Sequence, residues 1–325
     1  MSVYRKEDRS EDCGYADAEE RARTWWENGE LGNPPANLGN EMYGCLIRAA
    51  YGDEEARRAS KLRSQVDRRE YLSFSDVRKL YNAASFASAL NQPLNEFWTL
   101  SWAAGGVEGD AAGAECFDRA KAALRKHCRT AGLPDGLIYV HEKGREFGFH
   151  THVLLHVSVQ DRRDRRAFVQ QHITGLLGKE ALAVKRRLSD GKEIKLFSHR
   201  TTSGQSLGNQ LDFQWRAFRY LLKGVYEHER VPEVGRGLRP RNSVCEVFDL
   251  RRDELRKSLR LDFEGPRAGV THSLAGGAQK RAGFVSALER GKVAGSRLYD
   301  PEFYVEYERE RQTRELLQKL ATISC

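Results

Sequence analysis

The segment Phe147–Val157 reads FGFHTHVLLHV, an apolar run in which His150 and His152 stand two residues apart. A short run rich in Val, Leu and Phe predicts a buried strand. Successive side chains of a strand point to opposite faces, so the two histidines share one face while Thr151 and Val153 lie on the other. The segment therefore predicts a sheet that carries two neighbouring imidazoles on one face.

A third polar residue can join these histidines from the neighbouring strand. Leu137–His141 is a second strand candidate, and the connection EKGREFG that follows it contains glycine and suits a hairpin. Two imidazoles roughly 6 to 7 Å apart along a strand can converge on one divalent ion, and Glu142 is the best placed carboxylate. One Glu and two His leave positions open for a substrate oxygen. We predict a metal site of Glu142, His150 and His152; half-buried structural histidines are the alternative.

Two further histidines flank this pattern. His156 shares the face by parity but lies farther along the strand, so we expect it to be structural or to support a ligand from outside. His141 precedes Glu142 directly and should point to the opposite face.

Tyr220 and Lys223 stand on the polar side of a predicted helix, Leu211–Tyr226. The core side of this helix is made by Trp215, Phe218, Leu222 and Val225. Tyr220 is therefore presented to solvent, and an exposed tyrosine without a role is the alternative. A tyrosine with a pKa near 10 is a weak nucleophile at neutral pH, so a cation such as Lys223 would help it. Tyr226 points well away from Tyr220, and we expect no direct role for it.

The order of elements predicts an α+β fold with a central, mainly antiparallel sheet flanked by helices. Besides the hairpin and the tyrosine helix, the expected elements are strands at Phe97–Trp102 and Ile194–Ser198 and helices at Cys116–Ala131 and Arg166–Leu177.

The chain divides into three predicted regions. Residues 1–92 form a helical accessory region whose first 30 or so residues are expected to lack fixed structure; Ser73 or Ser75 caps its last helix. Residues 93–230 form the central domain with the sheet. Residues 231–325 form a basic, helical C-terminal region.

The 325 residues carry a formal net charge of +8, which favours a polyanionic partner, and nucleic acid is the first candidate. Basic runs at Arg162–Arg166, Lys185–Arg187 and Arg236–Arg241 could follow a phosphate backbone, or they could be solvated faces. The six cysteines form no CxxC pair, which indicates reduced thiols. The absence of a long apolar run predicts a cytoplasmic protein without a membrane partner.

Three motifs in this order resemble those of the HUH single-strand DNA endonucleases, most closely the single-tyrosine rolling-circle replication initiators of bacterial plasmids and phages. FWTLSW is similar to the first motif of that family, FHTHVLL to its metal-binding histidine motif and YLLK to its nucleophile motif. PLNEFWTLSW also resembles bacterial initiators. Thr151 departs from the family pattern, which has a bulky hydrophobic residue there, but a β-branched residue still suits a strand.

The resemblance implies a ferredoxin- or RRM-like core and a site-specific nicking and strand-transfer activity on single-stranded DNA at a replication origin. Mg²⁺ or Mn²⁺ would be held by Glu142, His150 and His152, and Tyr220 would form a 5′-phosphotyrosine with help from Lys223. The sequence has no GxxxxGK[ST] phosphate loop, so a host helicase and polymerase would be needed. A transposase or a mobilisation relaxase would use the same chemistry, and a non-catalytic nucleic-acid-binding module is the alternative from another class.

Overall fold

The computed structural model describes residues 71–183, 185–187, 191, 193–225, 243–251, 255, 259–263, 265–290, 295–304, 306–307, 309–310 and 313. Most of the accessory region, Tyr226 and the basic run Arg236–Arg241 lie outside the described residues. So does most of the polar C-terminal helix that the sequence suggests.

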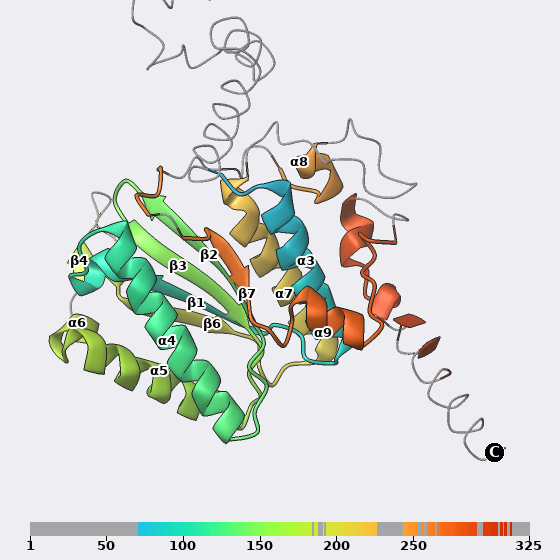
Figure 1. The fold of residues 1–325 in the computed structure, drawn as a ribbon, viewed down its shortest axis with the longest axis horizontal. Helices are drawn as coiled ribbons and strands as arrows, with labels where there is room; N and C mark the ends of the chain where they lie inside the picture. The colour runs from blue at the N-terminus through green and yellow to red at the C-terminus, as the bar shows by residue number, and fades with distance from the viewer. Residues whose placement is uncertain are drawn as a thin grey trace, which may run out of the picture. The chain divides into compact units, whose positions relative to one another are not determined.

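A five-stranded antiparallel sheet forms the centre of the described chain, which confirms the predicted fold class (Figure 1). Its strands stand in the order β6-β1-β3-β2-β7. Their bounds are β1 Glu96–Ser101, β2 Leu137–Gly144, β3 Gly148–Leu155, β6 Phe197–Thr201 and β7 Ala268–Val270. Two short strands, β4 Lys185–Arg187 and β5 Glu193–Lys195, pair with each other outside this sheet. The predicted hairpin is formed by β2 and β3, which lie inside the sheet between β1 and β7.

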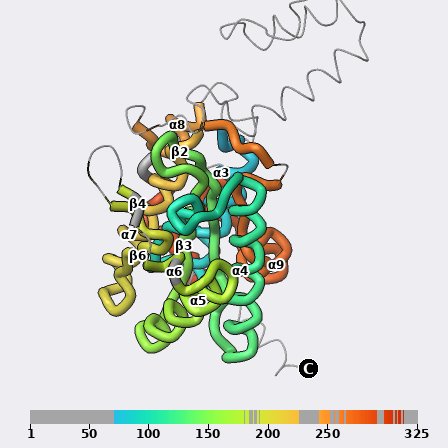
Figure 2. Tube along the Cα trace, turned by 90° about the vertical axis from the view of Figure 1, so that its left-hand side faces the viewer, coloured from blue at the N-terminus to red at the C-terminus, as the bar shows by residue number. Residues whose placement is uncertain are grey.

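Helices lie on both faces of the sheet. On one face are α4, Asp110–Thr130, and α5, Arg162–Leu177, which contact each other (Figure 2). On the other face are α3, Phe74–Ala89, and α7, Leu207–Leu221, which continues as a 3-10 turn at Leu222–Gly224. Further helical elements in the described part of the chain are α6 Glu180–Ala183, α8 Val244–Val247, α9 Gly276–Arg281 and 3-10 turns at Trp102–Gly105 and Gly295–Tyr299.

Each face of the sheet has its own apolar core, because side chains alternate along the strands. Ile138, Val140 and Leu154 pack with α3 and α7. Their neighbours along the chain, such as Tyr139 and Val153, pack with α4 and α5. Thr151 faces the second core and His150 and His152 face the first side, so the predicted division of the histidine strand is confirmed.

The helix α3 begins at a capping box. The Ser73 hydroxyl accepts a hydrogen bond from the backbone N–H of Asp76, and the Asp76 carboxylate accepts one from the N–H of Ser73. This confirms Ser73 rather than Ser75 as the cap. Val77 and Leu80 are fully buried against the core, and α3 belongs to the compact unit Arg68–Cys325 that also contains the sheet.

The segment predicted as one strand at Ile194–Ser198 forms two strands. Leu196 separates them: it is fully buried, and its carbonyl accepts a hydrogen bond from the N–H of Ser101 at the end of β1. The ladder partner of β5 is β4, whereas β6 joins β1 as the edge of the main sheet. Leu196 is apolar like Ile194 and Phe197, so the sequence shows no break between the two strands.

The sequence analysis missed β7, a three-residue strand in a glycine-rich stretch. Its Gly269 lies opposite Tyr139, and a Cβ at this position would lie 2.5 Å from the tyrosine ring. The glycine therefore allows β7 to approach β2 closely, although glycine usually counts against a strand.

Candidate metal centre

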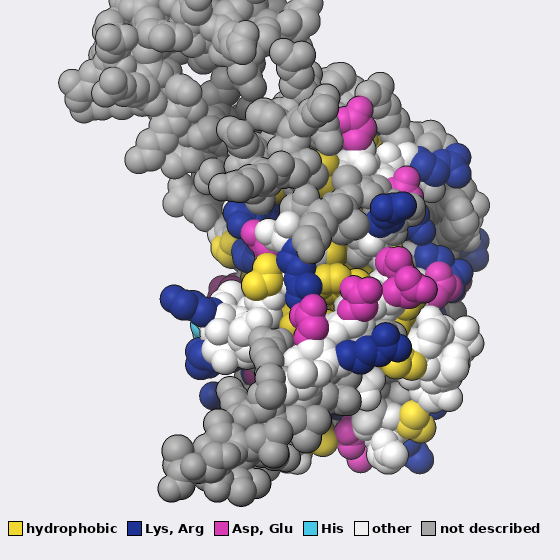
Figure 3. Space-filling view, turned by 90° about the vertical axis from the view of Figure 1, so that its right-hand side faces the viewer, with side chains coloured by type: hydrophobic (Ala, Val, Ile, Leu, Met, Phe, Trp, Pro, Cys, Tyr) yellow, Lys and Arg dark blue, Asp and Glu magenta, His cyan; other side chains and the backbone are white. Residues whose placement is uncertain are grey.

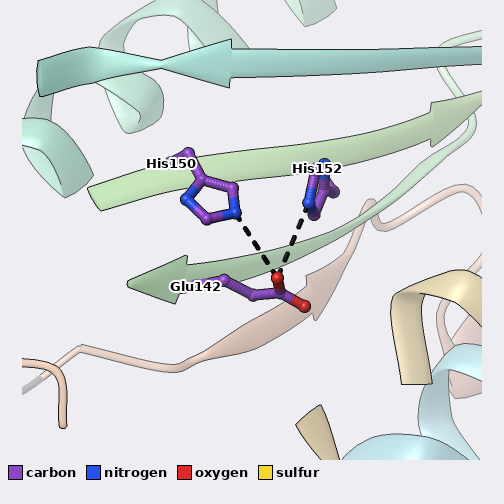
Figure 4. Close-up of side chains that lie close together, drawn as sticks. All are labelled: Glu142, His150 and His152. Carbon is purple, nitrogen blue, oxygen red and sulfur yellow. Dashed lines mark ion pairs between the residues drawn. The ribbon is translucent and has the colours of Figure 1, made fainter. Parts of the chain in front are cut away.

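Glu142, His150 and His152 come together on the side of the sheet that faces α7, as predicted. Glu142 on β2 and His150 on β3 are direct partners across the hairpin, and His152 follows two residues later on the same face. Their side chains point toward one another (Figure 4). The hairpin register alone therefore places the carboxylate beside the first histidine.

The distances suit one metal ion. His150 Nε2 lies 3.4 Å and His152 Nε2 3.6 Å from Glu142 Oε2, and one donor atom from each residue lies within 4.8 Å of the other two. Donors bound about 2.1 Å from one ion stand roughly 3 to 4 Å apart, so a small adjustment would suffice. The second carboxylate oxygen, Glu142 Oε1, is buried without a hydrogen-bond partner in the described part of the chain. The triad could therefore hold an ion, and Glu142 Oε1 could accept a further hydrogen bond or bind the ion as well.

Hydrogen bonds on the far side of each imidazole orient the metal-facing nitrogens. His150 Nδ1 lies 3.0 Å from the carbonyl oxygen of Gly148, which can only accept, so Nδ1 carries the proton. His152 Nδ1 lies 3.0 Å from Thr99 Oγ1. The Lys223 ammonium can only donate and lies 3.3 Å from His152 Nε2, so this nitrogen is the acceptor. In the neutral form of each imidazole, these contacts leave Nε2 with the lone pair that a metal requires.

Burial sets the charge states of the triad. Burial is the largest influence on Glu142 and raises its pKa, but contacts with His150 and His152 and the charge of Lys223 together bring the pKa well below its usual range. For His152, burial lowers the pKa to about 4, although Glu142 opposes this shift. At neutral pH the site therefore holds an ionised carboxylate and a neutral His152, which are the metal-binding forms.

Lys223 lies against the triad rather than on a solvated helix face. Its ammonium is 2.9 Å from Glu142 Oε2, and its side chain is only 14% exposed. The helix changes to a 3-10 turn at Leu222, and this turn directs Lys223 toward the sheet. The α-helix predicted to continue to Tyr226 thus ends at Leu221.

Tyr220 lies at the same centre and is the most accessible aromatic there, with 50% of its surface exposed. Its ring centroid is 5.3 Å from that of His152 and 3.9 Å from the Lys223 ammonium. The exposed tyrosine, the lysine and the two histidines, which the sequence predicted from separate segments, form one cluster.

Phe97 and Thr99, which the sequence predicted only as strand residues, also contact this cluster. The Phe97 ring stacks on His152 at 5.3 Å and meets the edge of Tyr220 at 5.7 Å, so it packs against both rings. Thr99 orients His152. The segment FWTLSW could have indicated that Phe97 and Thr99 share a face, because alternate residues of a strand face the same side of the sheet.

The remaining two histidines stay outside the triad. His141 faces the opposite core, where burial lowers its pKa to about 3, and its Nδ1 lies 2.8 Å from the Thr151 hydroxyl. That hydroxyl also accepts a hydrogen bond from Trp102, which explains a buried threonine at this strand position. His156 Nδ1 donates to the carbonyl of Pro93, so it has the structural role expected.

Gly224 and Arg267 complete the surroundings of the carboxylate. A Cβ at Gly224 would lie 2.8 Å from Arg267 Nη2 and 3.9 Å from Glu142 Oε1, so an alanine there would require the end of the Arg267 side chain to shift. Arg267 is 5% exposed, and no sequence pattern had indicated it.

No protein-family model, curated protein or solved structure matches the chain. Within its described residues, the chain has no helix both long and apolar enough to cross a membrane.

Proposed function

We propose that the protein is a metal-dependent single-strand DNA endonuclease and strand transferase that initiates rolling-circle replication of a plasmid or phage. The observation that carries the proposal is the half-exposed Tyr220 beside the buried triad of Glu142, His150 and His152. Phosphoryl transfer of this kind needs a nucleophile that the substrate can reach and a cation site next to it.

Glu142, His150 and His152 would hold the divalent ion, and the resemblance of the motifs to those of the HUH endonucleases implies Mg²⁺ or Mn²⁺. When bound, the ion supplies positive charge that polarises the scissile phosphate as a Lewis acid. The chain positions its ligands through the hydrogen bonds of His150 to Gly148 and of His152 to Thr99.

Tyr220 would attack the phosphorus atom through its phenolic oxygen. A bond forms between this oxygen and phosphorus, and the bond from phosphorus to the 3′ oxygen of the preceding nucleotide breaks. The tyrosine loses its proton, and the departing oxygen gains one as a 3′-hydroxyl. The product is a 5′-phosphotyrosine ester, which keeps the bond energy, so a second 3′-hydroxyl can reverse the reaction and join strands.

Lys223 would stabilise negative charge during this step. Its ammonium lies 3.9 Å from the centroid of the Tyr220 ring, so its positive charge stands beside the attacking residue. The same ammonium contacts Glu142, so it also bridges the nucleophile and the metal ligands.

The order of the three motifs favours a replication initiator. A transposase or a mobilisation relaxase would use the same residues, and the DNA distinguishes them: a replication origin, transposon ends or a transfer origin. A non-catalytic binding module would have little use for a buried carboxylate among two imidazoles, because each buried polar group is unfavourable unless it is matched.

The test is covalent adduct formation. Purified full-length protein is incubated with Mn²⁺ and single-stranded DNA of the replicon that encodes it, and the adduct is located by mass spectrometry. We expect one nucleotide-bearing peptide that contains Tyr220 and a 5′ linkage. Tyr220→Phe should form no adduct, whereas Tyr71→Phe should react as the wild type does.

Two outcomes would contradict the proposal. Cleavage by Tyr220→Phe at the wild-type rate would remove Tyr220 as the nucleophile. The absence of any adduct with every divalent metal and DNA strand tried would leave the non-catalytic binding module.

A further inference from the structure

We propose that a single-stranded DNA track crosses the metal-side face of the sheet from Arg200 on β6 to Phe147 beside β3, with the triad between them. Arg200 would bind the phosphate backbone on one side of the scissile bond, and Phe147 would stack on a base on the other side. The proposal rests on the proposed function, because it takes single-stranded DNA as the substrate.

Among the described residues, the helices cover the β2, β3 and β7 side of this face more fully than the β1 and β6 side. Ile138 on β2, Leu154 on β3 and Ala268 on β7 are fully buried beneath α3 and α7. Thr99 on β1 is only half-buried, and Arg200 at the edge is exposed. The triad therefore lies at the border between a covered and an accessible part of the sheet, where a bound strand could reach it.

The strand register places Arg200 near the reactive residues. Arg200 is the direct partner of Phe97, and Ser198 is the partner of Thr99, which in turn pairs with His152. Neighbouring strands are about 4.8 Å apart, so Arg200 is one strand away from the ring that contacts Tyr220. Ser198, also exposed, adds a hydroxyl donor in the row of His152.

The charge of Arg200 is available to a ligand. Within the described residues, the Arg200 side chain makes no ion pair or hydrogen bond. By contrast, two arginines of α7 are paired: Arg216 with Asp212 and Arg219 with Asp249. A planar guanidinium without a carboxylate partner suits a phosphate, to which it can donate two parallel hydrogen bonds.

Other basic surfaces offer less to a polyanion. In the run Arg162–Arg166, Arg165 is buried and donates to the carbonyl of His156, and Arg166 pairs with Glu96. On the side shown in Figure 3, acidic side chains stand among the basic ones, and Arg78 is paired with Glu289. The free cation beside the triad is thus a better phosphate ligand than these.

Phe147 marks the other end of the track. It lies in the tight turn between β2 and β3 and is 40% exposed, although it is a large apolar side chain. Its ring centroid is 5.8 Å from that of His150. Gly148, with a φ of 64°, lies at the end of this turn, and a Cβ there would come 2.7 Å from the Cβ of Ala103, so the backbone next to Phe147 requires glycine. An exposed ring held beside a metal ligand suits base stacking.

A cation at one end and an aromatic ring at the other, with phosphate chemistry between them, match a single nucleic-acid strand. The unpaired edge of β6 could instead accept a strand of another protein. That occupant would use backbone hydrogen bonds and would need neither Arg200 nor Phe147.

The test measures binding without cleavage. A fluorescein-labelled single-stranded oligonucleotide is titrated with full-length protein in EDTA, and anisotropy is followed at several salt concentrations. Arg200→Ala should weaken binding about three- to tenfold and reduce the slope of log K against log salt by about 0.7, the contribution of one phosphate contact. Arg119→Ala, an exposed arginine on α4, should change neither.

Phe147 is tested in the same assay. Phe147→Ala should weaken binding about fivefold or more, and Phe147→Trp should retain the wild-type affinity, because stacking does not depend on the identity of the ring. Val285→Ala, which removes another exposed apolar side chain, should have no effect. Thermal melting of each variant confirms that the fold is kept.

The proposed DNA track and the proposed reaction can be refuted independently of each other. If the wild type forms a Tyr220 adduct but Arg200→Ala and Phe147→Ala bind as it does, the track is wrong. The track would also be wrong if Arg119→Ala weakened binding as much as Arg200→Ala does. The same holds if duplex DNA bound as tightly as single-stranded DNA and Arg200→Ala and Phe147→Ala weakened its binding equally. If both variants weaken binding but no adduct forms with any metal, the track stands and the proposed function fails.

Discussion

Replacing Lys223 by methionine should tighten the binding of a divalent ion and slow DNA cleavage. The Lys223 ammonium is 2.9 Å from Glu142 Oε2, the oxygen that also lies closest to both histidines. An ion bound to that oxygen would stand roughly 3.5 to 5 Å from the ammonium, given metal–oxygen distances of about 2.1 Å. Metal and lysine therefore compete for one carboxylate.

The size of the effect follows from Coulomb's law. A divalent ion and a single positive charge about 4 Å apart repel each other by roughly 8 kcal/mol at an effective dielectric constant of 20 and by roughly 2 kcal/mol in water. Lys223 retains 14% exposure and can move outward, so the lower value is the better guide. Since 1.4 kcal/mol corresponds to tenfold in affinity, the variant should bind the ion at least about tenfold more tightly.

Isothermal titration with Mn²⁺ measures this affinity directly, and Lys121→Met, a lysine above Tyr139 on the opposite face, is the matched control. A second readout is thermal melting. Without metal, Lys223→Met leaves the Glu142 carboxylate buried without its cation and should melt below the wild type; Mn²⁺ should remove most of this difference. Unchanged or weaker Mn²⁺ binding by Lys223→Met would refute the competition.

Two other predictions concern the histidines. His152→Ala should lower Mn²⁺ affinity at least about 100-fold and abolish metal-dependent cleavage while the protein stays folded, and His156→Ala, the control, should bind Mn²⁺ normally; equal affinities would make His152 structural. The pKa of His141 is lowered by burial to about 3, against 6.5 in an unfolded chain, so between these values only the unfolded state gains the proton. Stability should therefore fall as the pH is lowered through this window. His141→Gln should reduce that slope in urea unfolding from pH 6.5 to 4, and an unchanged slope would exclude His141 as its source.

Local pattern was sufficient for much of the candidate site. The alternation of FHTHVLL placed both histidines on one face, the short connection to Leu137–His141 brought Glu142 opposite His150, and the spacing of the tyrosine helix exposed Tyr220. Each of these depends on the period of a single element or on a tight hairpin.

Features that join distant segments were not predictable in this way. The pairing of β7 with β2 depends on a glycine that accommodates the Tyr139 ring. The break between β5 and β6 depends on Leu196, which is buried where the chain passes from one ladder to another. In both cases a contact outside the local segment overrides the propensity of its residues.

The sequence by itself determined which side chains share a face, because strand and helix periods are local properties of the backbone. It thereby identified the triad and the presented tyrosine. Only the tertiary structure decided their distances, the turn that brings Lys223 to Glu142, and the roles of Phe97 and Thr99. It also decided that, among the described residues, Thr99 on β1 and Arg200 on β6 are more exposed than the triad. These features depend on how α7 packs over the sheet, and packing is set by contacts among residues far apart in the chain.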